Sequence, residues 1–280
     1  MLSRPLPRSP HFSDLAPCYI SGLERRAKRL IERKFKCLRQ GGWFTFGTGC
    51  SGTDIVAICI HALDAYLAGG DPKKLVAVQV LAVEADPSKQ GWIKLSWKTR
   101  RVSGASLYAD IAKLGLLRNV DIITGSDEET KKCFLFIAGF SCKELSSLNI
   151  AAAREIFQTV MAFASKSHQG LKRMRHGIDT STTATFWGIL VYLAIHRPCW
   201  FILENVLLVK RVLPIITKLL GDIDYTADWS IINSHDHGTR QHRGRIFVIG
   251  SWDHFQSTGS KTTYPYFNFR AVLRRLGGPL

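Results

Sequence analysis

Short apolar runs alternate with amphipathic stretches along most of the chain. The strand-like runs occupy 43–48, 75–84, 134–138 and 198–206, and turns or helical patterns separate them. Continuous apolar runs of this length are typical of buried strands, whereas apolar residues at a period near 3.6 indicate helices. Strands that alternate with helices predict an α/β fold with a doubly wound, Rossmann-like and mostly parallel sheet.

The same pattern places the helices between the strands and one hairpin after them. The segment 227–250 contains two more apolar runs on either side of a basic turn, so two paired strands are expected there. Residues 165–183 are polar, basic and glycine-containing, and are expected to form a mobile loop. The predicted helices cover 21–39, about 53–67, 150–164, 183–196 and 210–221.

These elements divide the chain into a tail, one catalytic domain and an extension. Residues 1–20 are proline-rich and are expected to be a disordered tail, although the Arg and Ser content before Asp14 also fits a transit peptide. The catalytic domain is expected at 21–250, and residues 251–280 form a short C-terminal extension. A length of 280 residues is ample for burying one large core.

Charge indicates the kind of partner. The chain has 38 Lys and Arg against 22 Asp and Glu, a net charge of +16. This balance favours a polyanion such as nucleic acid, and the alternative is a basic protein whose charges are only solvated. A hydrophobic content of 46% excludes a disordered chain. No apolar run approaches the roughly 20 residues that a membrane helix needs, so no membrane partner is expected.

The cysteines indicate the compartment. Seven cysteines, an odd number, are scattered along the chain without a C-x-x-C pair. That pattern favours a reducing intracellular compartment, the nucleus if the source is eukaryotic, and argues against a zinc site. Three histidines, His235, His237 and His242, lack the carboxylate or cysteine spacing of a metal site, so no metal is expected.

A glycine-rich turn joins the first strand to its helix. Gly47, Gly49 and Gly52 satisfy G-x-G-x-x-G in a strand–turn–helix context, which lets the backbone approach a cofactor. Glu84 ends the next strand, where an acid can hold ribose hydroxyls. Asp110 follows another short run and can reach an adenine edge. Each acid alone is more often a helix cap, but together they predict a cofactor that bears a nucleoside.

The run at 134–138 ends in a candidate nucleophile. Gly139 and Phe140 lead to Ser141, Cys142 and Lys143. Ligands of open α/β sheets bind beyond the carboxyl ends of the strands, and a thiolate there is accessible and strongly nucleophilic. Most buried cysteines are only small apolar residues, so Cys142 needs support from its neighbours in the chain.

That support comes from the order of the motifs. Six motifs follow one another along the chain. They are the glycine turn, the acid Glu84, Asp-Ile (110–111), Gly-Phe-x-Cys (139–142), Glu-Asn-Val (204–206) and Gln-x-Arg-x-Arg (241–245). In this order they resemble the DNA cytosine-5 methyltransferase family. The resemblance covers roughly 43–250, and the last segment matches through Asn233, Gly238, Gln241, Arg243 and Arg245.

The resemblance implies a class I methyltransferase fold, S-adenosylmethionine as the methyl donor and DNA as the substrate. Cys142 would add to carbon 6 of cytosine and make carbon 5 nucleophilic. Glu204 would hydrogen-bond or protonate ring nitrogen 3, Arg243 and Arg245 would hold the base, and Asn205 would orient the loop. The base would be flipped out of the duplex.

The remaining implied contacts concern the cofactor and the DNA. The basic loop after Cys142 would close over the DNA, because its lysines and arginines suit phosphate contacts. The implied cofactor-binding residues are Phe46, Gly47, Gly49, Ser51, Gly52, Thr53, Glu84, Asp110, Ile111 and Gly139. The implied nucleic-acid-binding residues are Lys166, Lys172, Arg173, Arg175 and Gln241.

The sequence departs from the family pattern in four places. Ser141 stands where the family has proline, and Cys50 stands where an aromatic residue is usual, which Phe46 would have to replace. About 27 residues intervene between Cys142 and the loop that would normally follow it. Only 30 residues follow Gly250, and neither a target-recognition region nor an Asn-x-Val signature is found in them.

These departures keep two alternatives open beside DNA methylation. One is a transfer-RNA cytosine-5 methyltransferase of the same class. The other is a catalytically inactive cofactor-binding scaffold, or an enzyme that needs a second subunit for target recognition. A dehydrogenase would share the glycine turn and Glu84 but would not need Cys142, Glu204 and the Gln-x-Arg-x-Arg segment together.

Overall fold

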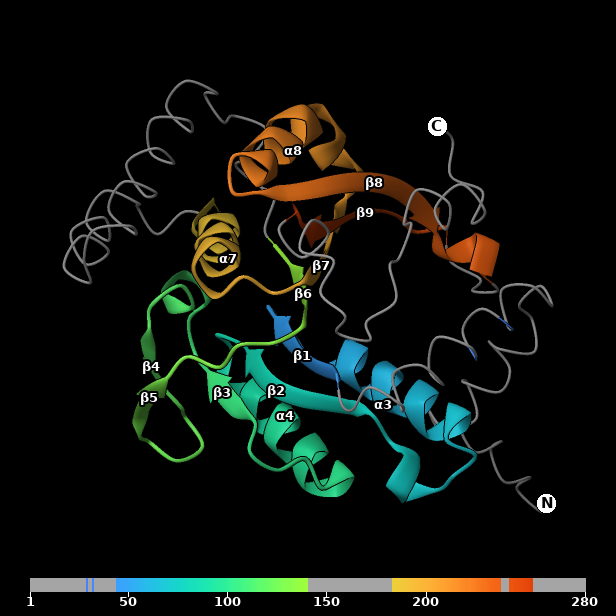
Figure 1. The fold of residues 1–280 in the computed structure, drawn as a ribbon, viewed down its shortest axis with the longest axis vertical. Coiled ribbons are helices and arrows are strands. Elements are labelled where there is room, and N and C mark those ends of the chain that lie inside the picture. Colours follow the sequence, from blue (N-terminus) through green and yellow to red (C-terminus); the bar gives the residue numbers. More distant parts are fainter. Residues whose placement is uncertain (1–28, 30–31, 33–43, 141–182, 238–241, 254–280) are drawn as a thin grey trace, which may run out of the picture. The chain divides into compact units, whose positions relative to one another are not determined.

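The structure is a computed structural model, and the residues that it describes are 29, 32, 44–140, 183–237 and 242–253 (Figure 1). They fall into two compact units. The smaller unit holds the described residues up to 44 and residues 54–78, and the larger holds 45–53 and the described residues from 79 onward. The predicted tail at 1–20 and nearly all of the predicted C-terminal extension therefore lie outside the described residues and stay predictions.

The smaller unit is built around one helix, α3 (Ile55–Leu67), and a short 3₁₀ turn, η1 (Pro72–Lys74). The helix starts about two residues later than predicted, because Asp54 takes a left-handed conformation at its N-cap, with φ of 60°. The buried carboxylate of Asp64 accepts the backbone N–H groups of Val76 and Ala77 at 2.9 and 2.8 Å. This carboxylate ties the helix to the chain that enters the second strand.

Seven strands form one sheet in the order β3-β2-β1-β6-β7-β9-β8. β1, β6 and β7 run parallel to one another, β2 is parallel to β3, and β9 is antiparallel to both β7 and β8. The predicted doubly wound, mostly parallel sheet is thereby confirmed. The strands are β1 (Phe44–Gly49), β2 (Ala77–Val83), β3 (Ser106–Tyr108), β6 (Leu135–Gly139), β7 (Trp200–Val206), β8 (Tyr225–Asn233) and β9 (Gly244–Trp252).

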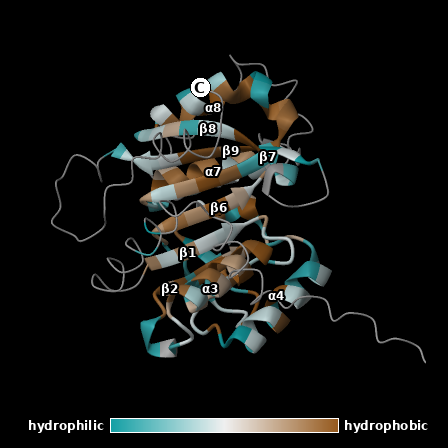
Figure 2. Ribbon diagram, turned by 90° about the vertical axis from the view of Figure 1, so that its right-hand side faces the viewer, coloured by the Kyte–Doolittle hydropathy of each residue, from teal (hydrophilic) through white to brown (hydrophobic). Residues whose placement is uncertain are grey.

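Helices of the larger unit cover both faces of the sheet. Leu81 and Val83 of β2 belong to a large buried cluster with side chains of α7 (Thr183–His196) and α8 (Leu213–Gly221). Ala82, between them, packs instead with Ile93 and Trp97 of α4 (Pro87–Arg100). Figure 1 shows α4 beside β2 and β3 and α7 beside β6 and β7, and Figure 2 shows the hydrophobic character of α7 and the central strands. In the described ranges, no helix has the length and apolar character that crossing a membrane requires.

Two segments differ from the predicted elements. The predicted helix at 210–221 is a 3₁₀ segment, η4 (Leu207–Val212), followed by α8, because Pro214 has no N–H to donate and opens a new helix. A small hairpin, β4 (Arg118–Val120) with β5 (Asp127–Glu129), was not predicted. Its strands are short and polar, so hydrophobic periodicity cannot reveal them.

Two further 3₁₀ segments complete the larger unit. η2 (Ile111–Lys113) follows β3 and is capped by Asp110, and η5 (Ser234–His237) begins the turn between β8 and β9. η2 lies directly against α7. A Cβ on Gly188 of α7 would lie 2.7 Å from the carbonyl carbon of Ile111, so only glycine lets the two backbones approach this closely.

Alanine at Gly188 is expected to lower the free energy of unfolding by about 1–3 kcal/mol, because the added methyl overlaps backbone atoms that cannot swing away. Gly91 is the matched control, since it lies inside α4 with nothing within 4 Å of its Cβ position. Alanine there should raise stability by about 0.5–1 kcal/mol. Urea denaturation followed by circular dichroism measures both, and equal stabilities of G188A and wild type would contradict the packing argument.

Candidate active site

The three glycines of the turn after β1 serve two purposes. A Cβ on Gly47 would lie 2.7 Å from Leu81 Cγ, and one on Gly49 would lie 2.8 Å from Ile111 Cδ1. Close packing around the sheet therefore requires these two glycines. Gly52 differs, because its φ is +57° and nothing lies within 4 Å of its Cβ position. Open space for a ligand therefore lies at Gly52, where only glycine adopts the backbone without strain.

Glu84 closes this turn with its carboxylate. Its Oε2 accepts the N–H of Gly52 at 2.6 Å, and its Oε1 accepts the N–H of Asp86 at 3.0 Å. A carboxylate offers about four lone-pair positions, so about two remain for hydroxyl groups of a ligand. The side-chain amide of Gln90 donates to the Glu84 carbonyl at 2.6 Å, a support that the sequence did not reveal.

Ser51 fixes the turn to both neighbouring strands. Its hydroxyl donates to the carbonyl oxygen of Thr48 at 3.0 Å, and its N–H donates to the carbonyl of Val83 in β2 at 2.9 Å. Thr53 is exposed on the other side of Gly52. The turn is thus held by its own polar groups, with its outer edge accessible.

Two other predicted cofactor residues lie at the end of β3. The carboxylate of Asp110 caps η2 by accepting the N–H of Ala112 at 2.9 Å, and it lies 3.9 Å from Lys113 Nζ. Ile111 is buried and lies against the Gly49 position. The predicted contact between Asp110 and an adenine edge stays a prediction, and in this structure the carboxylate is a helix cap.

The ring of Phe46 is buried beneath the turn. Phe46 has 0% of its surface exposed, so its side chain belongs to the core in this structure. Its predicted contact with the cofactor, in place of the aromatic residue that Cys50 displaces, stays a prediction. Cys50 itself has a positive φ of 50° and is exposed.

The carboxyl ends of β6 and β7 bring the catalytic candidates together. Gly139, at the end of β6, pairs with Glu204 of β7, and Val206 of β7 pairs with Arg245 of β9. The guanidinium Nε of Arg245 lies 2.8 Å from Glu204 Oε1. Glu204 Oε2 lies 3.6 Å from the position of a Cβ on Gly139. One carboxylate oxygen is therefore paired, and the other lies toward the strand that leads to Cys142.

Asn205 connects β7 to the start of the cysteine loop. Its side-chain amide is buried, donates to the carbonyl of Phe140 at 2.8 Å, and accepts the N–H of Val206 at 2.7 Å. Phe140 is two residues before Cys142, and its ring packs against Phe186 with centroids 5.1 Å apart. This amide holds the backbone from which the cysteine loop departs.

The turn between β8 and β9 positions the second predicted arginine. Asn233 Oδ1 accepts the N–H groups of His235 and Arg243 at 3.2 and 3.1 Å. The rings of His235 and His242 stack with centroids 4.0 Å apart. The side chain of Arg243 is exposed beside this turn, whereas that of Arg245 is held by Glu204. The structure thus brings Arg245, and not Arg243, to the carboxylate.

Desolvation of the thiol suppresses thiolate formation at three described cysteines of the larger unit. It raises the pKa of Cys133 to about 12 and that of Cys199 to about 11. Desolvation and the Glu84 carboxylate raise the pKa of Cys50 to about 11. A thiol with such a pKa is protonated at neutral pH and is a poor nucleophile. The chemistry of these three cysteines does not compete with that predicted for Cys142.

Several predicted residues lie outside the described residues, and their roles stay predictions. The helices predicted at 21–39 and 150–164 and the loop predicted at 165–183 lie almost wholly there as well. The residues concerned are Ser141, Cys142, Lys166, Lys172, Arg173, Arg175 and Gln241.

Comparison with known proteins shows what the chain is similar to. The family model for C-5 cytosine-specific DNA methylases matches residues 163–274. A type II methyltransferase of Staphylococcus aureus, M.Sau3AI, is 26% identical over 179 residues, which cover 58% of this chain and 38% of that protein. The chain is thus similar to C-5 cytosine-specific DNA methylases over these residues. Its seven-stranded sheet, with β9 antiparallel between β7 and β8, has the class I S-adenosylmethionine-dependent methyltransferase fold.

Another relative of the chain is much longer. The DNA (cytosine-5-)-methyltransferase DMT5 of Cryptococcus neoformans is 23% identical over 245 residues, covering 85% of this chain and 9% of that protein. The chain thus spans well under half of these curated relatives. The S. pombe Dnmt2 methyltransferase structure overlaps 75% of this chain and 49% of its own, with 15% identity and a TM-score of 0.43. That overlap is loose, and the fold follows from the strand order.

Replacing Asn205 with alanine is expected to slow methyl transfer about 10- to 100-fold, because a small displacement of a catalytic group costs rates of this order. It also leaves the carbonyl of Phe140 and the N–H of Val206 without a partner, which should cost about 1–3 kcal/mol of stability. Single-turnover rates and thermal denaturation measure the two effects. Asp at this position keeps the acceptor and removes the donor, so N205D at wild-type rate would contradict a role for the bond to Phe140.

Proposed function

We propose that the protein transfers a methyl group from S-adenosylmethionine to carbon 5 of cytosine in DNA. One observation carries the proposal: the Glu204–Arg245 ion pair, 2.8 Å long, beside the end of the strand that leads to Cys142. A carboxylate held by an arginine at the carboxyl edge of the sheet can recognise a base and control its protonation. The net charge of +16 supports a polyanionic substrate.

The residues at the glycine turn fit a nucleoside-bearing cofactor. Open space lies at Gly52, Glu84 keeps lone pairs for ribose hydroxyls, and Asp110 offers a second carboxylate. S-Adenosylmethionine supplies an electrophilic methyl group when bound. Gly52, Glu84 and Asp110 would hold its adenosine part.

The chain's own groups act on the base. The Cys142 thiolate adds to carbon 6, which places electron density on carbon 5. Glu204, oriented by Arg245, hydrogen-bonds or protonates ring nitrogen 3 through its other oxygen, so that negative charge does not build up on the ring. Carbon 5 then takes up the methyl group. Loss of the carbon 5 proton to a base and return of the nitrogen 3 proton to Glu204 let the thiolate leave from carbon 6, which restores the free enzyme and the aromatic ring.

The duplex must open for this reaction. A cytosine inside a duplex does not reach a side chain at a strand end, so the base is flipped into the site. Arg243 and the basic residues of 165–183 would hold the phosphates around it. A second subunit that supplies part of the target recognition belongs to the same proposal.

A reducing intracellular compartment, the nucleus in a eukaryote, is part of the same proposal. It is supported by the free state of Cys50, Cys59, Cys133 and Cys199. Cys142 would need the same conditions to remain a nucleophile.

Transfer of a labelled methyl group from S-adenosylmethionine to duplex DNA and to transfer RNA tests the function. We expect label in DNA, at carbon 5 of cytosine after enzymatic digestion to nucleosides. Label only in transfer RNA would assign the alternative substrate. Binding of S-adenosylmethionine without transfer to either would favour an inactive scaffold or a missing subunit. Addition of cell extract separates these two cases, because only an enzyme that lacks a subunit would regain methyl transfer.

A further inference from the structure

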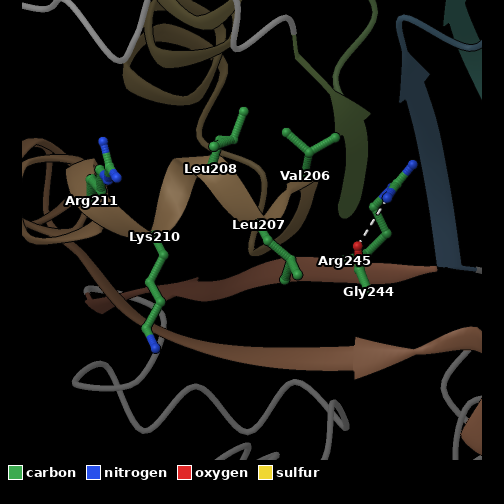
Figure 3. Close-up of a pocket in the computed structure, with 7 residues that line it drawn as sticks. All are labelled: Val206, Leu207, Leu208, Lys210, Arg211, Gly244 and Arg245. Carbon is green, nitrogen blue, oxygen red and sulfur yellow. Dashed lines mark hydrogen bonds between the residues drawn. The ribbon is translucent and has the colours of Figure 1, made fainter. Parts of the chain in front are cut away.

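A pocket of about 670 Å³ lies directly beside the catalytic ion pair. Figure 3 shows the residues that line it, which come from the end of β7, from η4 and from the start of β9. These elements meet at the carboxyl edge of the parallel strands, where the substrate base is expected. The lining residues are Val206, Leu207, Leu208, Lys210, Arg211, Gly244 and Arg245.

The pocket has an apolar surface that the fold does not bury. Leu207 is 46% exposed and Leu208 is 66% exposed, although both directly follow the Glu-Asn-Val segment. Gly244 seats Leu207 against β9, since a Cβ there would lie 2.9 Å from Leu207 Cδ1. Exposed apolar side chains within a concave site are typical of ligand contacts.

The charged residues of the pocket are all cationic. Arg245 is neutralised by Glu204, whereas Lys210 and Arg211 are exposed and form no ion pair within the part of the chain that the structure describes. None of the lining residues that the structure describes is acidic. Apolar surface bordered by two unpaired cations complements a nucleotide, whose base and sugar are apolar on their faces and whose phosphate is anionic.

The position of the pocket beside the ion pair indicates which nucleotide of the DNA it would bind. Arg245 belongs both to this pocket and to the ion pair that would hold the target cytosine. Arg245 pairs with Glu204 and lines the same pocket as η4. If a cytosine is flipped toward Glu204, the next nucleotide of its strand therefore lies within reach of η4. The flipped base also leaves its neighbour without a stacking partner, and apolar side chains can cover that exposed face.

We propose that this pocket binds the DNA nucleotide adjacent to the target cytosine, with Leu207 and Leu208 against its base or sugar and Lys210 and Arg211 at its phosphate. The inference rests on the proposed function for the position of the target base. It adds a DNA contact at η4, a segment that the motifs of the sequence do not assign.

A double variant, Lys210→Ala with Arg211→Ala, tests the phosphate contact. The measurement is fluorescence anisotropy of a labelled 30-base-pair cytosine-containing duplex with the full chain at several salt concentrations. We expect roughly tenfold weaker binding and a salt dependence whose slope falls by about 1–2, since each lost phosphate contact removes about 0.9 from the slope. Lys98→Ala with Lys218→Ala removes the same charge from exposed sites outside the pocket and should match wild type.

Leu208→Ser tests the apolar contact. It should weaken binding about 3- to 10-fold, the loss expected for one apolar contact, while leaving the salt slope unchanged, because no phosphate contact is removed. Leu95→Ser is the control, since Leu95 is 55% exposed on α4, outside the pocket. Circular dichroism shows whether each variant is folded, and the lysine and arginine changes remove no buried side chain.

The outcomes separate this inference from the proposed function. Unchanged DNA affinity and slope in the pocket variants would overturn the inference, as would a wild type that does not bind the duplex. If the pocket variants lost affinity only for a transfer-RNA probe, the pocket would bind RNA and the inference would be overturned. A loss of affinity only for a partner protein would overturn it as well. Loss of DNA affinity with a wild type that transfers no methyl group would sustain the pocket while the proposed function fails.

Discussion

A Cys142→Ala variant is expected to lose methyl transfer by at least about 10⁴-fold, the scale seen when a covalent nucleophile is removed. Carbon 5 of cytosine is a poor nucleophile until a thiolate adds to carbon 6, so no other side chain of the site substitutes for the thiol. Binding of S-adenosylmethionine and DNA should stay close to wild type. The measurements are single-turnover methyl transfer and equilibrium binding of both substrates.

The other cysteines give a sharp control for this prediction. Burial raises the pKa of Cys133 to about 12 and that of Cys199 to about 11, so neither is a thiolate at neutral pH. Cys59 is exposed on α3 and can be replaced by alanine without a cavity. We expect C59A to keep wild-type activity, and only C142A to lose the covalent complex that DNA containing 5-fluorocytosine traps. A trapped complex with C142A would mean that another nucleophile acts.

Hydrophobic runs predicted the sheet of this chain well, because buried parallel strands have few polar positions. The strand expected at 43–48 is β1 at Phe44–Gly49, and the helix expected at 183–196 is α7 with the same bounds. The strand at 198–206 is β7 from Trp200, since Pro198 cannot donate to a strand ladder. Element type followed from periodicity, and boundaries followed from glycine and proline.

Side-chain hydrogen bonds, which periodicity does not report, account for what was missed. The β4–β5 hairpin is fixed by Asp121, whose carboxylate accepts the N–H groups of Leu107 and Ile123, and by Asn119, which donates to the carbonyl of Lys113. One of these contacts, between Leu107 and Asp121, joins residues 14 positions apart, and nothing in the local composition distinguishes such an Asp or Asn from one on the surface.

The candidate site shows the same division. Motif order predicted roles for Glu204, Asn205 and Arg245, and the strand register places Glu204 opposite Gly139 and Arg245 opposite Val206. The motifs could not show that Gly47 and Gly49 are required by packing or that Phe46 is buried. Two exposed leucines directly after Glu-Asn-Val were the available signal for the η4 pocket, and they stood out only once their exposure was known.

Replacing Glu204 with glutamine should lower the rate of methyl transfer by about 10²- to 10⁴-fold, because glutamine cannot protonate ring nitrogen 3 or pair with a guanidinium as a carboxylate does. The backbone geometry should persist, since glutamine has the same length and Glu204 is held by the β6 and β9 ladders. The loss should fall on the single-turnover rate, with little change in DNA affinity.

The partner residue then shows whether the ion pair acts as one unit. Arg245→Ala leaves the Glu204 carboxylate without its 2.8 Å partner, so its loss and that of Glu204→Gln should be strongly non-additive in the double variant. The matched control is the surface pair Arg118–Asp127 at 3.2 Å, where Asp127→Asn should leave the rate unchanged. Additive losses at Glu204 and Arg245 would show that each contacts the substrate independently. A non-additive result would instead assign to Arg245 the task of orienting Glu204, as the pairing of Oε1 with Arg245 and the position of Oε2 beside Gly139 imply.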